Sequence, residues 1–385
     1  MNAIILAAGN SLRMYQTGAN IHKALLPIQN IPNIERTILM LQFCNITEII
    51  IAVPYQCTLF DYLAEKYSCK IIYKKKECAN TLHTINDLLT YIDDTFIIEG
   101  DVVLAKNIFD IFENSTYYVM KYPKPEIDDW HPVLNQDGNV STFQISQENT
   151  AAIFGISFWA HKDCPLLISH LKQKAAIYDI QDPDIFWDNN IIEILDRISV
   201  KTYEISADVA CEMNTYEEYK FAQEICKSAI YGSLFFDNVT LRTENDIHFK
   251  ICHSTEKETN IYWLDQLFNY YGEELFKDSR YLAYEDFFST NEQVFIIKIG
   301  SLEVGFFSFV HEKKYILLRR LYVSSNRRNK HIGTQIVRYI QLYSKFNSKE
   351  FRVNVYDDDA EKFYNHLGFK LKFKTFGLED RKSVV

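Results

Sequence analysis

Apolar residues in the first part of the chain form short unbroken runs that alternate with segments of helical spacing. Ile4–Leu6, Ile49–Val53 and Lys70–Tyr73 have the continuous apolar character of strands that are covered on both faces of a parallel sheet. Between the first two runs, the apolar positions of residues 33–43 recur with the period of a helix. This alternation predicts right-handed crossovers and an open, mostly parallel sheet, whose ligands bind at the carboxyl ends of the strands.

Three further segments extend the pattern. A strand is predicted to begin at Thr95 and to end in the polar triplet Glu99–Asp101. The Asp137–Gly138 pair predicts the turn of a hairpin, because this dipeptide readily adopts the positive φ that tight turns require. Ile153–Trp159 predicts another buried strand. We therefore expect an α/β domain with a Rossmann-like sheet in the first half.

The order of elements changes after residue 230. An amphipathic helix is predicted over residues 261–276, and three consecutive strands joined by brief turns follow it. A helix with one apolar face then begins near Ile332. We predict two domains, residues 1–228 and 233–385, of which the second has an α+β fold. The three consecutive strands are expected over residues 294–299, 303–310 and 315–323.

The composition is that of a globular chain with room for two cores. Its formal net charge of −10 argues against a nucleic-acid binder, which would carry a basic face. The 8 cysteines form no C-x-x-C pair, so neither a zinc site nor a disulfide framework is expected. No stretch is apolar enough to cross a membrane, and the first strand begins without a leader. We expect a soluble, cytoplasmic protein without nucleic-acid or membrane partners, and a homodimer is compatible with this composition.

The loop after the first strand resembles a phosphate-binding loop. Small residues let backbone N–H groups approach an anion, and an arginine adds a fork of donors. Leu6–Met14 resembles the L-A-A-G-x-S-x-R-M signature of nucleotidyltransferases, which transfer a nucleoside monophosphate from an NTP to a phosphate-bearing substrate. The resemblance implies a catalytic role for Arg13 and a nucleotide-binding loop. The expected nucleotide-binding residues of this loop are Leu6, Ala7, Ala8, Gly9, Asn10 and Ser11.

A lysine motif follows this loop. His22–Arg36 resembles the P-K-A-L and L-I-E-R stretch of the same family, with His22 where the family has proline. In the family the lysine lies against the nucleotide phosphates, where its charge offsets the charge that develops as pyrophosphate leaves. The resemblance therefore assigns this role to Lys23.

Two oxygen ligands for Mg²⁺ are predicted from separate segments. Asp101 follows an apolar strand, which places its carboxylate at the edge of the sheet where the family binds its metal. Cys211–Tyr219 resembles the closing motif of the family, in which Asn214 takes the place of the second ligand. Thr215 and Glu218 also form an S/T-x-x-E capping box, which is a purely structural interpretation of this segment.

Two looser matches point to one branch of the family. The segment around Asn80 and Thr81 resembles a loop that holds the nucleotide in the bacterial choline-phosphate cytidylyltransferases. The segment around Trp187 and Asp188 resembles their Y-W-E-D stretch. Trp130, Trp187 and Asp188 are predicted to bind the acceptor, since indole faces attract alkylammonium groups. Tryptophans buried in the core are the alternative.

The second domain carries a different anion site. A strand leads into a polar loop with two arginines and then into a helix that opens at a glycine, which exposes amide groups to an anion. This order resembles the acyl-CoA loop, [RQ]-x-x-G-x-[GA], of the GNAT N-acetyltransferases, with His331 in place of the first glycine. The resemblance implies that CoA is bound by Leu321, Val323, Arg328, Asn329, Gly333, Thr334 and Asn354.

The last helix supplies the predicted acid. Residues 357–369 resemble the N-x-x-A-x-x-x-Y-x-x-x-G-F ending of the GNAT family, whose tyrosine often protonates the departing CoA thiolate. Tyr364 takes that position, and a core tyrosine on an amphipathic helix is the structural alternative. Glu303, Glu312 and a water chain are all open as the general base.

Together the resemblances predict a bifunctional enzyme. The first domain would transfer CMP from CTP, with Mg²⁺, to a small phosphorylated or phosphonate acceptor and release pyrophosphate. The second domain would acylate an amine from acetyl-CoA. Two alternatives are a sugar 1-phosphate as the acceptor, and a regulatory protein whose two sites have decayed.

Overall fold

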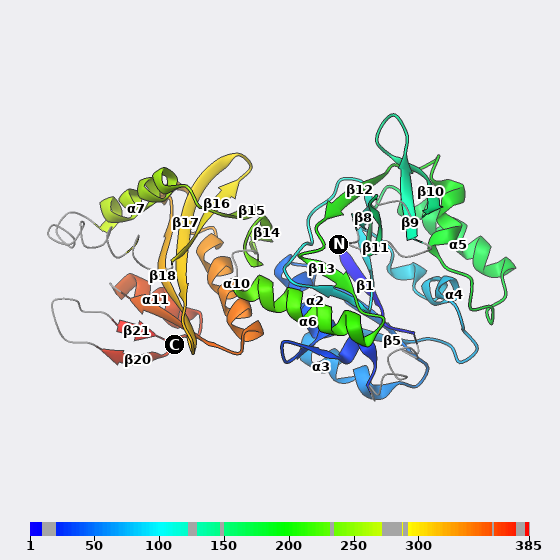
Figure 1. Ribbon diagram of the computed structural model, residues 1–385, viewed down its shortest axis with the longest axis horizontal. Helices are drawn as coiled ribbons and strands as arrows, with labels where there is room; N and C mark the ends of the chain where they lie inside the picture. Colours follow the sequence, from blue (N-terminus) through cyan, green and yellow to red (C-terminus); the bar gives the residue numbers. More distant parts are fainter. Residues whose placement is uncertain are drawn as a thin grey trace. The chain divides into compact units, whose positions relative to one another are not determined.

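The computed structural model describes most of the chain and divides it into two compact units (Figure 1). The described residues are 1–9, 21–121, 129–146, 150–231, 235–271, 287, 292–355, 358–374 and 382–384. The first unit comprises Met1–Gln42, Ile46–Ala105 and Phe109–Cys226, and the second comprises Phe43–Asn45, Lys106–Ile108 and Lys227–Val385.

A seven-stranded sheet forms the centre of the first unit. Its order is β12 (Val200–Ile205), β8 (Ser115–Met120), β11 (Ala152–Trp159), β6 (Thr95–Glu99), β1 (Asn2–Leu6), β4 (Ile49–Val53) and β5 (Lys70–Tyr73). Strand β11 runs antiparallel to β6 and β8, and the other neighbouring pairs are parallel. The predicted mostly parallel sheet is therefore confirmed.

Helices cover both faces of this sheet. Figure 1 shows α4 (Thr81–Asn86) and α5 (Cys164–Ile177) on one side, and α2 (Asn33–Phe43) and α6 (Tyr216–Tyr231) on the other. Strands β1, β4 and β6 are largely buried, as their unbroken apolar runs require. Shorter helical segments are η1 (Lys23–Leu25), η2 (Thr58–Phe60), α3 (Tyr62–Tyr67), η3 (Leu89–Tyr91) and η4 (Asp188–Ile194).

Three small antiparallel sheets complete the first unit. The hairpin of β9 (Asp129–Leu134) and β10 (Val140–Ser146) turns at Asp137–Gly138, where Gly138 has a φ of 69°. This confirms the predicted hairpin. The other two pairs are β2 (Pro27–Ile28) with β3 (Ile31–Pro32), and β7 (Val102–Leu104) with β13 (Ala210–Glu212).

The second unit contains an eight-stranded sheet. Its order is β14 (Val239–Arg242), β15 (His248–His253), β16 (Gln293–Ile299), β17 (Leu302–His311), β18 (Tyr315–Val323), β19 (Glu350–Val355), β21 (Lys382–Val384) and β20 (Leu371–Lys374). Successive antiparallel pairing of β16, β17 and β18 confirms the predicted meander. Only β18 and β19 pair in parallel among the described strands of this sheet.

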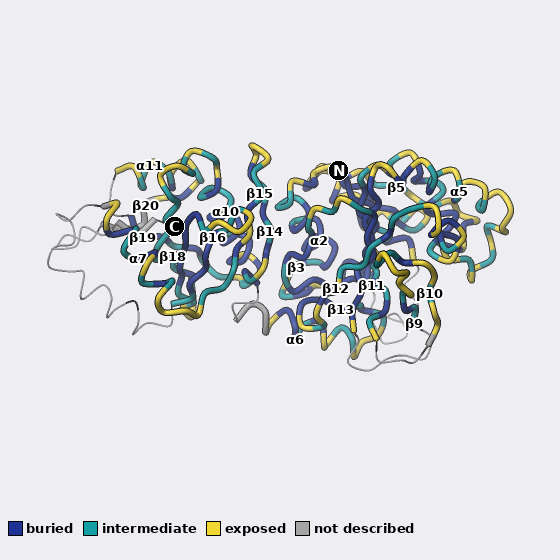
Figure 2. Tube along the Cα trace, turned by 90° about the horizontal axis from the view of Figure 1, so that it is seen from above, coloured by how far each residue is buried: buried dark blue, intermediate teal, exposed yellow. Residues whose placement is uncertain are grey.

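Helices also lie on both faces of the second sheet. α10 (Ile332–Phe346) covers one face and α7 (Lys257–Tyr271) lies on the other (Figures 1 and 2), while α11 (Asp358–His366) packs against β19. A short turn, η6 (Ser325–Arg327), precedes α10. The helix predicted over 261–276 is present as α7, and residues 272–276 lie outside the described residues. No helix in the described ranges is both long and apolar enough to span a membrane.

Candidate functional site

The structure brings together three residues that were predicted from separate motifs. The ammonium group of Lys23 forms an ion pair with the carboxylate of Asp101 and donates a hydrogen bond to Oδ1 of Asn214 at 3.0 Å. These partners lie 78 and 191 residues from the lysine in the sequence. Asp101 is only 5% exposed, so its charge is held in a largely dehydrated position. The three side chains form a compact polar centre beside the carboxyl ends of β1 and β6.

Gly100 explains why Asp101 reaches the end of β1. Its N–H group donates a hydrogen bond to the carbonyl of Leu6 at 3.0 Å. A Cβ atom on Gly100 would lie 3.0 Å from both the Leu6 oxygen and the Ala7 Cα, which are backbone atoms with little freedom to move. A residue without a side chain is therefore required for this approach. The close backbone contact places the predicted nucleotide loop against the turn that carries Asp101.

His22 holds the same loop from the other side. Its Nδ1 accepts a hydrogen bond from the N–H of Ala24 at 3.2 Å, so Nε2 carries the proton and donates to the carbonyl of Gly9 at 2.8 Å. Burial lowers the pKa of His22, and its neutral form is the one that these two contacts need. The residue that replaces the family's proline thus connects Gly9 to the helical turn of Lys23.

The structure describes four of the seven residues predicted for the phosphate-binding loop and its arginine. Leu6, Ala7, Ala8 and Gly9 lie at the carboxyl end of β1, as expected for a loop that faces a ligand. Asn10, Ser11 and Arg13 lie outside the described residues.

The turn that carries Asn214 is fixed by the predicted capping box. Glu218 accepts hydrogen bonds from the N–H groups of Asn214 and Thr215, and the Thr215 hydroxyl accepts one from the N–H of Glu218 at 3.3 Å. The structural interpretation of this segment is therefore confirmed. It is compatible with a ligand role for Asn214, because the box leaves the Asn214 side chain directed at Lys23.

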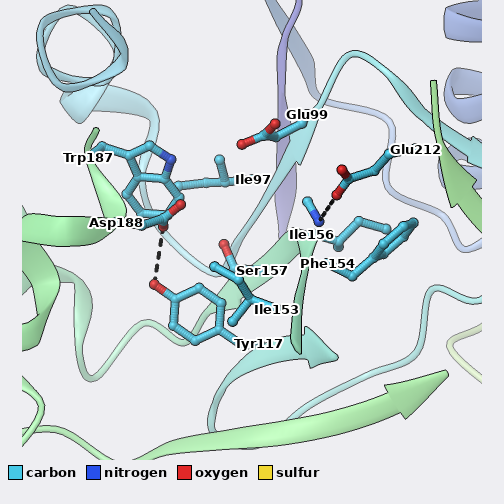
Figure 3. A pocket seen from close by; sticks show the side chains of 11 residues that line it. Ile97, Glu99, Tyr117, Ile153, Phe154, Ile156, Ser157, Trp187, Asp188 and Glu212 are labelled. Atoms are coloured by element: carbon cyan, nitrogen blue, oxygen red, sulfur yellow. Dashed lines mark hydrogen bonds between the residues drawn. The ribbon is translucent and has the colours of Figure 1, made fainter. Parts of the chain in front are cut away.

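An acidic pocket lies next to this polar centre (Figure 3). Trp187 and Asp188, two of the residues predicted to bind the acceptor, line it together with Glu99, Glu212 and Tyr117. The other lining residues are Ile97, Ile153, Phe154, Gly155, Ile156 and Ser157. The pocket therefore combines three carboxylates with aromatic rings, which is a suitable environment for a positively charged group.

Burial and mutual repulsion change the ionisation of these carboxylates. Burial raises the pKa of Asp188 to about 7, although a hydrogen bond from the Tyr117 hydroxyl at 3.2 Å opposes the shift. The pKa of Glu99 is raised well above its ordinary value by burial and by the charges of Asp101, Glu212 and Asp188, whereas Lys23 opposes the shift. The Glu99 side chain remains accessible to water, so the repulsion between neighbouring carboxylates outweighs burial as the cause of its raised pKa. A cation in the pocket would relieve that repulsion.

Sequence reasoning did not identify Glu99, Glu212 and Tyr117. Two of them have a signal in the sequence, because Glu99 and Glu212 each lie two residues before a predicted metal ligand. In an extended segment, residues two positions apart point to the same side. Tyr117 lies in the middle of β8 with no local motif, so only the fold reveals its place in the pocket.

The two predicted tryptophans have different positions. Trp187 is 4% exposed and packs edge-on against Trp159 at 6.1 Å between ring centroids, so it belongs to the core and to the pocket wall. Trp130 packs against Phe143 of the neighbouring strand at 5.7 Å and does not line the pocket. Cross-strand packing holds the Trp130 ring in the hairpin, and its role in acceptor binding stays a prediction.

The nucleotide-binding prediction for Asn80 needs a correction, whereas that for Thr81 stays a prediction. Asn80 is 4% exposed, and its amide nitrogen donates hydrogen bonds to the carbonyls of Asp179, Ile180 and Asp182. Its oxygen accepts a hydrogen bond from the N–H of His83 at 2.9 Å. The donors and the acceptor of this amide are therefore engaged within the protein, and its side chain is not available to hold a nucleotide. The Thr81 hydroxyl accepts from the N–H of Trp187 at 3.1 Å.

The second unit presents backbone groups where CoA binding was predicted. The parallel pairing of β18 with β19 ends at Leu318 and Val353, so Leu321 and Val323 continue along β18 beyond that pairing. α10 begins at Ile332, directly after the predicted anion loop. Gly333, Thr334 and Asn354 occupy the first turn of α10 and the end of β19.

The anion loop keeps an unusual backbone without its first glycine. His331 has a φ of 61° and Asn329 a φ of 58°, which is the left-handed region that glycine favours. Arg328 donates from Nε to the carbonyl of Val323 at 2.8 Å, and its guanidinium lies 3.7 Å from the centroid of the Tyr270 ring. The loop is therefore held by the side chain of its arginine.

Tyr364 is 7% exposed, and the centroid of its ring lies 5.0 Å from that of Phe363 and 5.5 Å from that of Phe369. Its place on α11 agrees with the structural alternative, a core tyrosine, and leaves the acid role a prediction. Of the residues considered as the general base, Glu303 accepts from Nε1 of Trp263 at 3.1 Å and pairs with Lys298 at 3.2 Å.

Comparison with known proteins identifies both units. Residues 3–134 match the family model of the MobA-like NTP transferase domain. The choline-phosphate cytidylyltransferase of Haemophilus influenzae is 33% identical over 220 residues, which cover 57% of this chain and 94% of that protein. The chain belongs to the family of the choline-phosphate cytidylyltransferases. Residues 290–371 match the family model of the acetyltransferase (GNAT) domain. Both are families of enzymes, as predicted.

Two further members place the chain within the cytidylyltransferase family. The 2-aminoethylphosphonate cytidylyltransferase of Lancefieldella rimae is 24% identical over 223 residues, 56% of this chain and 89% of that protein. The solved CTP:phosphocholine cytidylyltransferase of Streptococcus pneumoniae, LicC, matches with a TM-score of 0.54 and 26% identity, and the match covers 58% of this chain and 98% of that one. The similarity therefore spans almost the whole length of the solved relative and a little more than half of this chain.

Proposed function

We propose that the first unit transfers CMP from CTP to a small acceptor that carries a phosphate or phosphonate group and a positively charged nitrogen. One observation carries this proposal: the Lys23–Asp101–Asn214 centre lies beside a pocket of three carboxylates. The two regions are electrostatically connected, since both Lys23 and Asp101 act on the ionisation of Glu99. One region suits the phosphates of a nucleotide and the other suits a cation.

The names of the relatives agree with this acceptor class. Phosphocholine and 2-aminoethylphosphonate each join a phosphorus group to a positively charged nitrogen, and they differ in the substitution of that nitrogen. In the proposed complex the nitrogen lies among Glu99, Asp188 and Glu212, and the phosphorus group points toward Lys23. A neutral sugar would gain no attraction from these carboxylates, so the pocket disfavours a sugar 1-phosphate.

The residues of the polar centre fit a magnesium ion. Oxygen atoms of Asp101 and Asn214 already converge on one cationic group, the ammonium of Lys23, and hard oxygen ligands are those that Mg²⁺ prefers. Asp101 and Asn214 would hold the ion. When bound, Mg²⁺ would neutralise charge on the phosphate oxygens of the nucleotide.

The chemical step is an in-line displacement at phosphorus. An oxygen of the acceptor phosphate or phosphonate attacks the α-phosphorus of CTP, a new P–O bond forms, and the bond to pyrophosphate breaks. Lys23 offers positive charge to the phosphate oxygens, and Arg13 is assigned the same task by its motif. Holding both reactants in line supplies much of the rate enhancement, because little covalent chemistry is left to the protein.

The second unit is proposed to acylate an amine from acetyl-CoA. The amine nitrogen attacks the thioester carbonyl carbon and forms a C–N bond, and the C–S bond breaks. Tyr364 gives a proton to the departing thiolate, while the nitrogen releases a proton to water, which restores the tyrosine hydroxyl. Backbone amides near Leu321–Val323 are available to the carbonyl oxygen, because β19 does not pair with this part of β18. The amides at the start of α10 suit the pyrophosphate of CoA.

A substrate panel tests the first activity. The protein is incubated with Mg²⁺, each of the four common NTPs and one acceptor at a time, and pyrophosphate release is measured. The acceptors are phosphocholine, phosphoethanolamine, 2-aminoethylphosphonate and glucose 1-phosphate. Release is expected with CTP and a nitrogen-bearing acceptor. Release only with the sugar phosphate, or with no pair, would contradict the proposal.

A matched pair of measurements tests the second activity. Acetyl-CoA should raise the melting temperature of the wild-type protein and of Tyr364→Phe equally, because the hydroxyl is not needed for CoA binding. Transfer to an amine should be about a hundredfold slower in the variant. Equal transfer rates would remove Tyr364 from the mechanism, and the absence of any stabilisation by acetyl-CoA would contradict CoA binding.

A further inference from the structure

A short helix and a distant loop meet at the wall of the acidic pocket. The loop, residues 178–188, leads from the end of α5 to the first residue of η4. Its last two residues, Trp187 and Asp188, line the pocket. Figure 3 shows both side chains on one side of the pocket, with Asp188 bonded to Tyr117. We name this segment the acceptor loop. Its position decides where the carboxylate of Asp188 lies.

Asn80 fastens the first part of the acceptor loop. Its amide nitrogen lies 3.1, 3.3 and 2.9 Å from the carbonyl oxygens of Asp179, Ile180 and Asp182. The backbone N–H of Ala79 donates a further hydrogen bond to Ile180 at 2.9 Å. These contacts join residues about 100 positions apart.

Thr81 fastens the other end of the acceptor loop. Its hydroxyl oxygen accepts a hydrogen bond from the backbone N–H of Trp187 at 3.1 Å. Trp187 is buried, so loss of this partner would leave an amide without its hydrogen bond in a largely dry position. One helix start thus holds the loop at both ends.

The middle of the acceptor loop has little packing of its own. Asp179, Gln181 and Phe186 are exposed, and Ile185 is only partly buried against the core. A loop with few buried contacts is costly to order when a ligand arrives, and ordering it in advance improves affinity. We propose that Asn80 and Thr81 are positioning residues, which hold Trp187 and Asp188 in place for the acceptor. This inference rests on the proposed function, in which the pocket binds the acceptor.

Substitutions of Thr81 test the inference in the full-length protein. Thr81→Val removes the hydroxyl and keeps the shape, and Thr81→Ser keeps the hydroxyl. We expect Thr81→Val to raise the KM of the nitrogen-bearing acceptor about fivefold, with the KM of CTP and kcat changed by less than about twofold. Thr81→Ser should restore the wild-type value. A higher KM for CTP with an unchanged KM for the acceptor would overturn the inference and return Thr81 to nucleotide binding.

Thr84→Val provides a matched control. This threonine lies on the same helix, is buried, and bonds to the carbonyl of Asn80 and not to the acceptor loop. We expect its acceptor KM to equal that of the wild type. If both valine variants raise this KM equally, general damage to α4 explains the effect and the positioning role is refuted.

Hydrogen exchange separates this inference from the proposed activity, since it needs no substrate. Amides of residues 178–188 should exchange about fivefold faster in Thr81→Val than in the wild type, while those of β1 and β4 stay unchanged. Unchanged exchange in the loop would overturn the positioning role even if the enzyme is active. Faster exchange in a protein that releases no pyrophosphate would support the positioning role and contradict the proposed cytidylyltransferase activity.

Discussion

The two units of this chain build their candidate sites in different ways. In the first unit, side chains from distant segments meet at one point, as Lys23 does with Asp101 and Asn214. In the second unit, the predicted contacts to CoA come mainly from backbone amides at a strand end and a helix start. A site of side chains depends on residue identity, whereas a site of backbone amides depends on conformation.

This difference explains how each motif departs from its family. The second unit lacks the first glycine of its loop, but His331 still adopts the left-handed backbone that a glycine would provide. Asn329 does the same, and asparagine tolerates that region comparatively well. In the first unit Lys23 and Asp101 are present. His22, which stands where the family has proline, supports the loop through a hydrogen bond to Gly9.

The largest expected effect is on the side-chain site. Asp101→Ala removes the partner of Lys23 and a proposed ligand of Mg²⁺, so we expect pyrophosphate release to fall about a thousandfold. The acyl-transfer rate of the same preparation is the internal control and should stay within about twofold of the wild type. An equal loss of both activities would show that the substitution damages the whole protein.

A substitution at Gly100 tests whether the turn that carries Asp101 must lie close to the backbone of Leu6 and Ala7. Gly100→Ala places a methyl group 3.0 Å from Leu6 and Ala7 backbone atoms, so we expect a loss of about 1–3 kcal/mol in the free energy of unfolding. Pyrophosphate release should fall with it, because Asp101 is displaced. Gly333→Ala is the matched control, since its new methyl group would lie at an ordinary 3.6 Å from Phe363. Equal stability of the two variants in denaturant melts would contradict the close contact.

The acidic pocket predicts a pH dependence of the activity of the first unit. Because the pKa of Asp188 is raised to about 7, the charged fraction of its carboxylate falls as the pH drops below that value. A cationic acceptor binds the charged form, so its KM should fall as pH rises from about 6 to 8, by up to about tenfold per unit below pH 7. Asp188→Asn should flatten this profile. A wild-type profile that is already flat would remove Asp188 from acceptor binding.

The smallest expected effect is on the backbone site. His331→Gly removes the Cβ atom from a residue with a left-handed backbone. We therefore expect the free energy of unfolding to rise by about 1 kcal/mol. Affinity for acetyl-CoA should improve no more than about threefold, because the amides already have the required conformation. Asn329→Gly, at a similar φ, should change stability less. Calorimetric titration and thermal melts of both variants measure the two quantities.

Several features of the candidate sites could be predicted because they depend on few neighbours. The turn at Asp137–Gly138 and the box of Thr215 with Glu218 involve residues close in sequence. The role of Asn80 could not be predicted in this way. Its motif suggested a nucleotide, but its partners are carbonyls about 100 positions away, and the packing of α4 against α5 brings them within reach.

The sequence by itself determined the alternation of strands and helices, and it placed Lys23 and Asp101 in recognisable motifs, because apolar runs and local turns are properties of neighbouring residues. Only the tertiary structure decided that Lys23 meets both Asp101 and Asn214, and that Glu99, Asp188 and Glu212 share one pocket. The physical reason is that these contacts join separate segments, whose approach is set by the packing of the whole sheet and not by any pattern along the chain.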